Sequence, residues 1–201
     1  YKTFNPGTIN EKVALNGLSL KLNEGDFVTV IGGNGAGKST MLNAVAGVWP
    51  VDEGQIIIDG TDVTKLSEYK RAAYLGRVFQ DPMTGTAATM GIEENLALAK
   101  RRGKTRLLRP GITKAERAEY KELLKILNLG LEDRLTSKVG LLSGGQRQAL
   151  TLLMATLQKP KLLLLDEHTA ALDPKTAAKV LDITDKIVNR DHLTTLMITH
   201  N

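Results

Sequence analysis

Short continuous apolar runs alternate with longer amphipathic segments along the chain. Phe27–Ile31 and Leu162–Leu165 are such runs, and a continuous apolar run is typical of a strand buried on both faces of a parallel sheet. Alternating strands and helices predict an α/β fold. The further strands predicted are Gln55–Gly60 with its turn, Tyr74–Gln80 and Thr194–Thr199.

The N-terminal segment, Tyr1–Asp26, has a different pattern, in which polar and apolar residues alternate. The alternation is clearest in Leu18–Leu22, and a period of two indicates antiparallel strands with one solvated face. We therefore expect an antiparallel β region ahead of the buried strand Phe27–Ile31.

Residues Ile92 to Gln158 are predicted to be mainly helical. Thr113–Glu116 has the form of a capping box and opens a helix with an apolar face. Asp173 is placed to cap a later helix, with Pro174 at its first position. The apolar faces expected are Tyr120, Leu123, Leu124 and Leu127 in the first helix, and Val180, Ile183 and Ile187 in the later one.

Composition places the chain among ordinary globular proteins. Its 201 residues, 42% hydrophobic and 24% charged, suit one domain with a substantial core. It contains no cysteine, which excludes disulfides and thiolate metal sites, and it has no apolar run near the roughly 20 residues of a spanning helix. We expect a chain that neither crosses a membrane nor is exported by itself. Because it begins at Tyr1, we expect a piece of a longer protein whose C-terminal end is missing.

The net charge of +5 is modest and does not demand nucleic acid. Positive charge gathers between residues 100 and 117, where the sequence offers few acids. A solvated loop is the ordinary interpretation of such a run, and contact with lipid head groups or nucleic acid is the alternative. The cations are Lys100, Arg101, Arg102, Lys104, Arg106, Arg109, Lys114 and Arg117.

A glycine-rich loop separates the apolar strand Phe27–Ile31 from a predicted helix. The loop fits G-x-x-x-x-G-K-[ST], and in this context its backbone N–H groups and the helix N-terminus surround phosphate oxygens. Lys38 is expected to reach the β- and γ-phosphates, and the Ser39 hydroxyl to bind Mg²⁺. The chain is therefore predicted to bind a nucleoside triphosphate such as ATP. The loop residues are Gly32, Gly33, Asn34, Gly35, Ala36, Gly37, Lys38, Ser39 and Thr40.

Polar residues end three other predicted strands. Asp166 and Glu167 follow the four-leucine run, and carboxylates there are costly unless a cation or hydrogen bonds satisfy them. We expect Asp166 to hold Mg²⁺ and Glu167 to act as the general base or to position the attacking water. Gln80 is a candidate ligand of Mg²⁺ and of that water, and His200 a candidate donor to the γ-phosphate. Taken singly, Gln80 and His200 are each more readily explained as ordinary polar residues of a loop.

A second anion-binding loop is predicted at Leu142–Gln148, before the helix Ala149–Leu157. Ser143 is a natural N-cap, and Gly144 and Gly145 allow an anion close to the backbone. One set of catalytic residues with two phosphate-binding loops suggests a symmetric pair, in which the second loop of one subunit covers the nucleotide of the other. The residues expected to make that contact are Ser143, Gly144, Gly145 and Gln146.

Over essentially its whole length the chain resembles the ATPase subunit of ATP-binding-cassette (ABC) transporters. Residues 32–40 match Walker A, 142–146 the family signature and 163–167 Walker B. Gln80 matches the Q-loop, 170–173 the D-loop and His200 the switch histidine. The resemblance implies a P-loop NTPase (RecA-like) core with an N-terminal antiparallel β region and an inserted helical subdomain. Residues 1–80 and 159–201 would form the core, and residues 81–158 the subdomain.

The same resemblance implies roles for residues that pattern alone leaves open. It supports catalytic roles for Gln80 and His200, and it makes Phe4 the adenine-stacking residue, with Tyr1 as the alternative. From position alone, the Phe4 ring could instead cover the sheet edge. The chain departs from the family at His168, where proline is usual, and at Ala170, where serine is common. Neither change removes a catalytic group, so ATPase activity is expected.

The function implied is that of a transport motor, in which two copies close around two MgATP and move the helices of a transmembrane permease. Family similarity favours a bacterial importer of amino acids or a related small solute, lying in the cytoplasm against the inner face of the membrane, with the permease contact at about residues 81–98. No nucleic-acid partner is expected. The alternatives are a soluble ABC ATPase of the ribosome-acting tandem type and a P-loop kinase, which would leave Leu142–Gln148 without a purpose.

Overall fold

The computed structural model of the chain describes residues 1–104 and 111–199. Its centre is a parallel sheet of four strands among these residues, in the order β3-β8-β7-β6. The strands are β3 (Phe27–Ile31), β6 (Leu75–Val78), β7 (Leu162–Asp166) and β8 (Thr195–Thr199). The predicted parallel sheet, and with it the α/β fold class, is confirmed.

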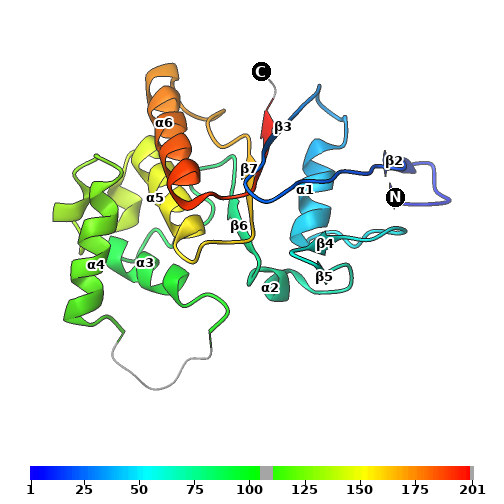
Figure 1. Ribbon diagram of the computed structural model, residues 1–201. Helices are drawn as coiled ribbons and strands as arrows, with labels where there is room; N and C mark the ends of the chain where they lie inside the picture. The colour runs from blue at the N-terminus through cyan, green and yellow to red at the C-terminus, as the bar shows by residue number, and fades with distance from the viewer. Residues whose placement is uncertain (105–110, 200–201) are drawn as a thin grey trace.

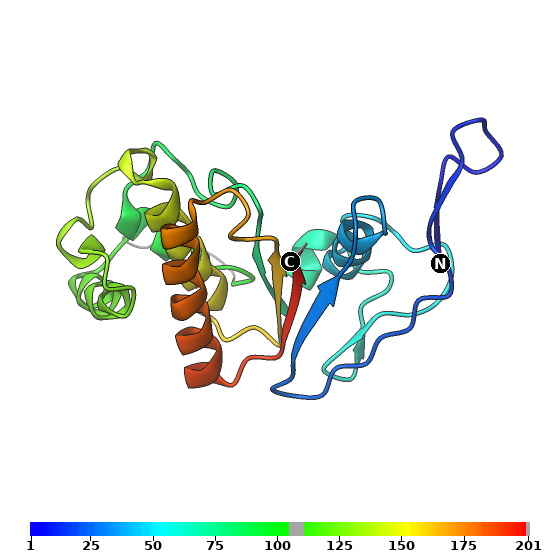
Figure 2. The ribbon, with the colours of Figure 1, turned by 90° about the horizontal axis from the view of Figure 1, so that it is seen from above.

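Helices cover the sheet from two sides, as Figures 1 and 2 show. α1 (Lys38–Ala46) packs with β2 (Lys12–Leu15) and β7 on one side, and α5 (Gly144–Thr156) and α6 (Pro174–Asp191) lie on the other. α3 (Ile92–Lys100) and α4 (Lys114–Lys125) pack against α5, while the short α2 (Glu68–Arg71) precedes β6. Two short 3-10 helices, Leu131–Asp133 and Val139–Leu141, connect α4 with α5.

The apolar core has two parts, one on each side of the sheet. The larger part joins side chains of α3, α4, α5 and α6 with those of β6 and β7, and the smaller joins α1 with β7 and β8. The helical segment therefore packs into the same cluster as the strands. Its description as a separate subdomain, residues 81–158, stays a prediction.

The N-terminal antiparallel region is smaller than the alternation predicted. β1 (Lys2–Phe4) pairs with β2 (Lys12–Leu15), and β4 (Ile57–Ile58) pairs with β5 (Thr61–Asp62) across a turn. Leu18–Leu22, where the alternation is clearest, is not a strand, and Leu18 and Leu20 are exposed. Alternation supplies one apolar face, but a strand also needs a partner for its backbone, and no such pairing occurs here among the described residues.

The strand before the glycine-rich loop is less buried than its composition predicted. β3 lies at the edge of the four-stranded sheet, with Phe27 47% and Ile31 65% exposed. In contrast, Leu163–Leu165 of β7 are completely buried because β7 has a neighbour on each side. A run of apolar residues thus does not distinguish an edge strand from a central one.

The predicted helix starts are confirmed by their hydrogen bonds. The side chains of Thr113, Ser143 and Asp173 each accept a bond from the backbone N–H three residues later, and Pro174 opens α6. Such caps satisfy N–H groups that have no partner inside the helix. Tyr120, Leu124, Val180, Ile183 and Ile187 are buried, as predicted.

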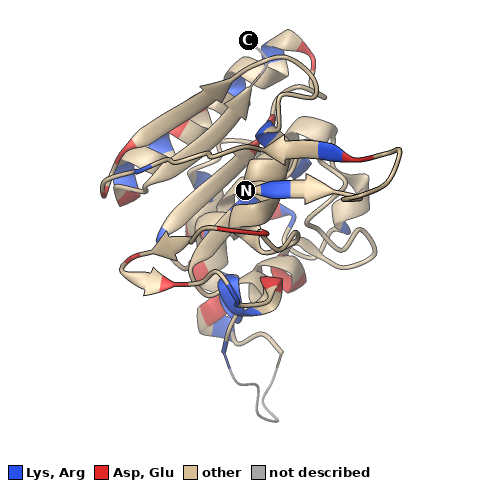
Figure 3. Ribbon diagram, turned by 90° about the vertical axis from the view of Figure 1, so that its right-hand side faces the viewer, with Lys and Arg blue, Asp and Glu red and all other residues tan. Residues whose placement is uncertain are grey.

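Among the described residues, three cations of the basic run between residues 100 and 117 form ion pairs within the chain. Lys100 forms an ion pair with Glu119, Arg101 with Glu116 at 2.8 Å, and Arg117 with Glu93 at 2.6 Å. In Figure 3, Lys and Arg segments of the ribbon lie among Asp and Glu segments. These ion pairs, with acids from α3 and α4, support a structural role for the run. Arg106 and Arg109 lie outside the described residues.

Arg71 fixes the end of α1. The residue is 2% exposed, and its guanidinium donates to the carbonyls of Ala44 at 2.6 Å and Val45 at 2.9 Å, in the last turn of that helix. It also donates to the carbonyls of Leu66 and Thr64 at 2.9 and 2.7 Å. A cation at a helix C-terminus satisfies carbonyls that have no partner in the helix. Arg71 thereby joins α1 to the segment that leads into β6.

We expect Arg71→Met to lower the free energy of unfolding by about 3 kcal/mol, because four carbonyls, one in a buried and three in partly buried hydrogen bonds, lose a charged donor. Urea unfolding followed by circular dichroism measures the change. Arg134→Met, at an exposed position, is the control and should change stability by less than about 0.5 kcal/mol. Equal effects of the two substitutions would contradict the role given to Arg71.

Candidate active site

All four strands of the sheet run in one direction, so their carboxyl ends meet at one edge. The register places Ile31 beside Thr199, Ile198 beside Asp166, and Leu165 beside Val78. The glycine-rich loop follows β3, Asp166 ends β7, and Gln80 lies two residues beyond β6. The structure thus brings the predicted phosphate loop, the acidic pair and Gln80 to the same edge. His200 follows β8 directly but lies outside the described residues.

The glycine-rich loop has the backbone that phosphate binding requires. Gly35 and Gly37 have φ angles of 81° and 87°, and a Cβ on Gly37 would lie 2.4 Å from the carbonyl oxygen of Ala14 in β2. Position 37 therefore needs glycine for both conformation and space. α1 begins at the next residue, Lys38, whose side chain is buried and whose Nζ donates to the carbonyls of Gly32 at 2.6 Å and Gly33 at 3.1 Å. The ammonium group thus lies inside the loop.

Glu167 has a strained backbone. Its φ of 45° lies in the left-handed region, which costs a residue with a Cβ of order 1–3 kcal/mol. Its N–H donates to the carbonyl of Ile198 in β8 at 3.1 Å, and its own carbonyl accepts from the N–H of Ala170 at 2.9 Å. Its side chain is buried, with the residue 9% exposed. Strain of this kind is concentrated at functional sites, because surrounding contacts must hold it.

Arg77 supplies a positive charge behind Asp166. Its Nη2 lies 3.4 Å from Oδ2 of Asp166 and 2.7 Å from Oδ1 of Asn43 in α1. The guanidinium carbon also lies 4.5 Å from the centre of the Phe79 ring, a cation–π distance. Both charged side chains are about 15% exposed, so solvent screens their attraction only partly. Arg77 thereby connects the strand before Gln80 to the aspartate expected to hold Mg²⁺.

His168, for which the sequence indicated no role, anchors the segment after Glu167. Its ring is buried, and Nε2 lies 3.1 Å from the hydroxyl oxygen of Thr184 in α6. That hydroxyl donates its own proton to the carbonyl of Val180 at 2.8 Å, so it accepts from His168 and the imidazole proton is assigned to Nε2. Burial lowers the pKa of His168 to about 4, which keeps the ring neutral at physiological pH.

Ser143 caps α5 as expected, but the helix begins at Gly144 rather than at Ala149, so the predicted loop is shorter and its glycines lie in the first turn of the helix. Ser143 and Gly144 are exposed, so they are accessible to a ligand or partner. Gly145 is buried, and a Cβ there would lie 2.1 Å from Cγ2 of Thr176 in α6. The absence of a side chain at 145 therefore permits close packing of α5 on α6.

Phe4 is the last residue of β1 and is partly exposed to solvent. Its ring meets that of Trp49 edge to face, with centroids 5.5 Å apart, and the Lys2 ammonium lies 5.5 Å from the Phe4 centroid. Trp49 follows α1 closely and is 42% exposed. The pair forms an aromatic surface near the end of the helix that starts at the phosphate loop, which suits a nucleobase. The stacking role of Phe4 stays a prediction.

The residues expected to hold Mg²⁺ offer one hydroxyl, one amide and one carboxylate. Ser39 is exposed at the second position of α1, Gln80 is exposed, and Asp166 is partly exposed at the end of β7. Oxygen donors in small number suit Mg²⁺, which usually binds to one or two carboxylates together with nucleotide phosphates and water. The donor set therefore fits this ion.

Comparison with known proteins agrees with this geometry. A sequence profile of the ABC transporter family matches residues 15–170. The tyrosine transport ATP-binding protein of Clostridioides difficile (strain R20291) is 49% identical over 197 residues, which cover 98% of this chain and 76% of that protein. The chain belongs to the ABC transporter family. It carries that family's ATPase cassette.

A second sequence relative and a solved structure agree with this family assignment. The methionine import ATP-binding protein MetN of Rhizobium etli is 39% identical over 191 residues, which cover 93% of this chain but 50% of MetN. This ABC chain thus spans about half the length of its methionine relatives. A dimeric ATP-binding cassette solved in a post-hydrolysis state with ADP and Pi matches with a TM-score of 0.81 and 31% identity, over 100% of this chain and 85% of that one. No helix among the described residues is long and apolar enough to cross a membrane.

The sequence alone indicated no role for Arg77, Trp49 or Gln148 around the ABC site, although the first two are conspicuous in the sequence. Arg77 is a charge inside an otherwise apolar strand, and Trp49 is the sole tryptophan of the chain. Gln148 is completely buried in the second turn of α5, the helix that begins in the family signature. Nothing in the sequence around it indicates this burial. A polar side chain at a buried position has to find a partner, and only the structure identifies it.

We expect the stability of the wild-type chain to fall between about pH 6.5 and pH 4 through His168. The unfolded chain takes up the imidazole proton near pH 6.5, whereas burial in the folded chain lowers the pKa of His168 to about 4. The shift of about 2.5 pH units corresponds to roughly 3 kcal/mol. Urea unfolding at several pH values should show that this stability is present above pH 6.5 and lost at pH 4.

His168→Gln is the matched variant, because it keeps a polar side chain but cannot take up a proton in this range. At pH 8 the free energy of unfolding of His168→Gln should be lower than that of wild type. This difference should shrink by roughly 3 kcal/mol on going to pH 4. A difference that stays constant over this range would contradict the assignment of a neutral, buried imidazole.

Proposed function

We propose that this chain is the ATP-hydrolysing motor of an importer that moves a small solute through a membrane permease. The observation that carries the proposal is the meeting of the phosphate loop, Asp166–Glu167 and Gln80 at one sheet edge. Relatives named for tyrosine transport and methionine import support an amino acid or a similar small solute as cargo.

Hydrolysis is assigned to residues at this edge. Lys38 and the N–H groups of residues 32–40 would bind the phosphates, while Ser39, Gln80 and Asp166 would hold Mg²⁺, which supplies positive charge between phosphate oxygens. Glu167 would orient and deprotonate the attacking water. In this proposal His200 donates to the γ-phosphate, and Phe4 stacks on the adenine.

The site would be completed by a second copy of the chain or by a paired ABC subunit. Ser143 and Gly144 are exposed at the N-terminus of α5, where the first N–H groups of a helix attract an anion. In the proposed dimer, residues 143–146 of each subunit cover the nucleotide of the other, so two ATP molecules lie between them. The dimeric state of the similar ADP-bound cassette supports this arrangement.

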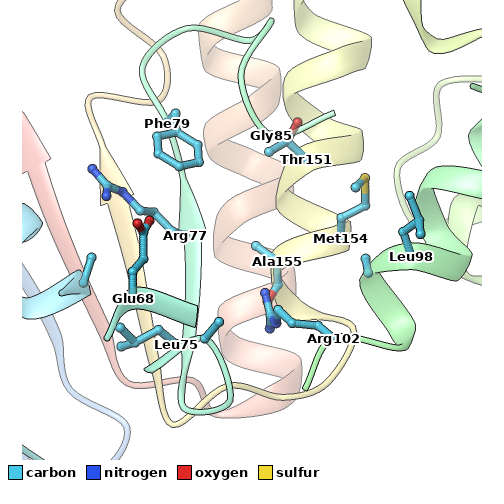
Figure 4. A pocket seen from close by; sticks show the side chains of 13 residues that line it. Glu68, Leu75, Arg77, Phe79, Gly85, Leu98, Arg102, Thr151, Met154 and Ala155 are labelled. Atoms are coloured by element: carbon cyan, nitrogen blue, oxygen red, sulfur yellow. The ribbon is translucent and has the colours of Figure 1, made fainter. Parts of the chain in front are cut away.

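A groove of about 360 Å³ lies between the sheet and the helices α3 and α5, and we assign it to the permease. Figure 4 shows Leu98 and Met154 on one side, Arg77 and Phe79 on the other, and Arg102 at one end. An apolar floor with charges at its margin suits a short amphipathic helix of the permease. The motor would then work in the cytoplasm, on the inner face of the membrane.

The loop of residues 83–87 runs along this groove and is held by α5, the helix that begins in the family signature, and by α3. Arg147, buried in the first turn of α5, donates to the hydroxyl of Thr86 at 2.7 Å and to the carbonyl of Met83 at 3.0 Å. Asn95 of α3 binds the N–H and the carbonyl of Ala87 at 2.8 and 3.1 Å. A permease helix that pushes on this loop would therefore act directly on α5, which begins at the proposed nucleotide contact.

We expect Glu167→Gln to lower the kcat for MgATP at least 100-fold while the Kd for MgATP stays within about threefold, because the amide keeps its size but cannot take a proton. Phosphate release and equilibrium binding measure the two quantities. With hydrolysis blocked, size-exclusion chromatography with light scattering should show an ATP-bound dimer.

Lys38→Ala is the comparison variant, because it removes the ammonium from the loop and should weaken nucleotide binding itself. Turnover at the wild-type rate in Glu167→Gln would disprove the role of Glu167. An unaltered MgATP affinity in Lys38→Ala would disprove the role of the loop.

We expect Leu98→Glu to reduce copurification of the full-length chain with the permease at least tenfold, because it places a carboxylate on the apolar floor of the groove. The partner for this test would be the product of a membrane-permease gene beside this gene, coexpressed with the chain and extracted in detergent. Binding of MgATP by the isolated chain should remain within about threefold of wild type.

Leu181→Glu is the matched control, since Leu181 in α6 is 43% exposed and Leu98 is 39% exposed. Leu181 does not line the groove, so its variant should copurify normally. Equal loss in both variants, or normal copurification of Leu98→Glu, would refute the assignment of the groove to the permease.

A further inference from the structure

Gln148 is a buried amide whose contacts lie on both sides of the candidate catalytic residues. It is 0% exposed, and its Nε2 donates to the carbonyl of Phe79 at 2.9 Å and to the carbonyl of His168 at 2.7 Å. Phe79 directly precedes Gln80, and His168 directly follows Glu167. One side chain of α5 thus holds the backbone next to both Gln80 and Glu167, to which the proposed function gives roles in binding Mg²⁺ and in activating the attacking water.

These two bonds continue the connection between β6 and β7 beyond their pairing. The ladder between the strands ends at Val78 and Leu165, and Gln80 and Glu167 both lie two residues further on. Glu167 itself is bonded to β8 through Ile198. Past the end of the β6–β7 ladder, the Gln148 amide therefore links the two chain segments that carry Gln80 and Glu167.

The strained backbone of Glu167 makes this link significant. A left-handed φ of 45° persists only if neighbouring residues are held in place. On the C-terminal side of Glu167, the ring of His168 is bonded to Thr184 of α6, and the carbonyl of His168 to Gln148 of α5. The residue after the strained position is thus fixed from two helices.

Gln148 makes these contacts although its side-chain oxygen, Oε1, is buried and accepts no hydrogen bond among the described residues. Turning the amide over would place that oxygen against two carbonyl oxygens, so the observed orientation is the favourable one. A buried acceptor without a partner carries a desolvation penalty, which an apolar residue of the same length would avoid. The two donated bonds are therefore what distinguishes glutamine from such a residue here.

The helix that carries Gln148 begins at the proposed contact with the partner's nucleotide. Gly144 and Gln148 are one turn apart, about 6 Å along the axis. A displacement of the start of α5 is thus transmitted to the carbonyls of Phe79 and His168 through a rigid helix and two short bonds.

We propose that Gln148 is a positioning residue that sets the spacing between Gln80 and Glu167 and couples this spacing to the placement of α5. The proposal rests on the roles that the proposed function gives to Gln80, Glu167 and the start of α5. It assigns to Gln148 no contact with the nucleotide, so its effect should fall on turnover and not on binding.

The test is Gln148→Met, which keeps the length of the side chain but removes both donors. We expect its kcat for MgATP to fall between about tenfold and 100-fold, because misplacement of catalytic groups by about 1 Å has effects of this size. The Kd for MgATP should stay within about threefold, and the dependence of rate on ATP concentration should lose cooperativity, because the partner's site acts through α5. Equilibrium binding and phosphate release on the full-length chain measure these quantities.

Thr156→Val is the control in the same helix. Thr156 is 2% exposed, and its hydroxyl bonds to carbonyls of α5 itself, at Leu152 and Leu153, so its removal lowers stability without touching Phe79 or His168. If Gln148→Met does not fold, Gln148→Leu replaces it, because leucine is a smaller apolar side chain that also lacks a donor for either carbonyl.

The outcomes distinguish the positioning role of Gln148 from the proposed function on which it rests. A kcat in the Gln148 variant equal to that of Thr156→Val, or a weakened Kd with unchanged kcat, would overturn the positioning role. Glu167→Gln is measured alongside. If Glu167→Gln loses turnover but the Gln148 variant does not, only the inference about Gln148 fails. If Glu167→Gln turns over normally, the proposed function fails.

Discussion

Parallel pairing of β3, β8, β7 and β6 requires the chain to return to the same end of the sheet before each strand. The loops at the carboxyl ends therefore meet at one edge, and α1, α5 and α6 lie on the two faces of the sheet. The phosphate loop, the acidic pair Asp166–Glu167 and Gln80 come together for this reason. Chemistry contributed by residues more than 100 positions apart depends on this one pairing scheme.

Buried polar groups join the helices to that edge. Arg71 satisfies the carbonyls at the end of α1, Arg77 lies between Asn43 and Asp166, and Gln148 holds the carbonyls of Phe79 and His168. Each of these groups would be costly if left without a partner, so each fixes the distance between two elements. The ABC cassette is thus held as one unit around its site, while the start of α5 remains exposed for a partner.

The sequence was sufficient where the information is local. The capping residues Thr113, Ser143 and Asp173 and the strand Leu162–Leu165 were predicted and are confirmed by the structure, as are the strand before the glycine-rich loop and the helix after it. It was misleading where burial depends on neighbours. Phe27–Ile31 was expected to be buried but is an edge strand, and Leu18–Leu22 has strand-like alternation without a paired backbone.

The sequence by itself determined the family, the nucleotide chemistry and the residue types at the sheet edge, because a phosphate loop is a short motif whose geometry follows from its glycines and the next helix. Only the tertiary structure decided what surrounds them. It placed Glu167 in a left-handed conformation, gave His168 a partner in Thr184, and brought Gln148 to two carbonyls from different segments. These contacts join residues distant in sequence, and packing, which no local pattern encodes, sets their distances.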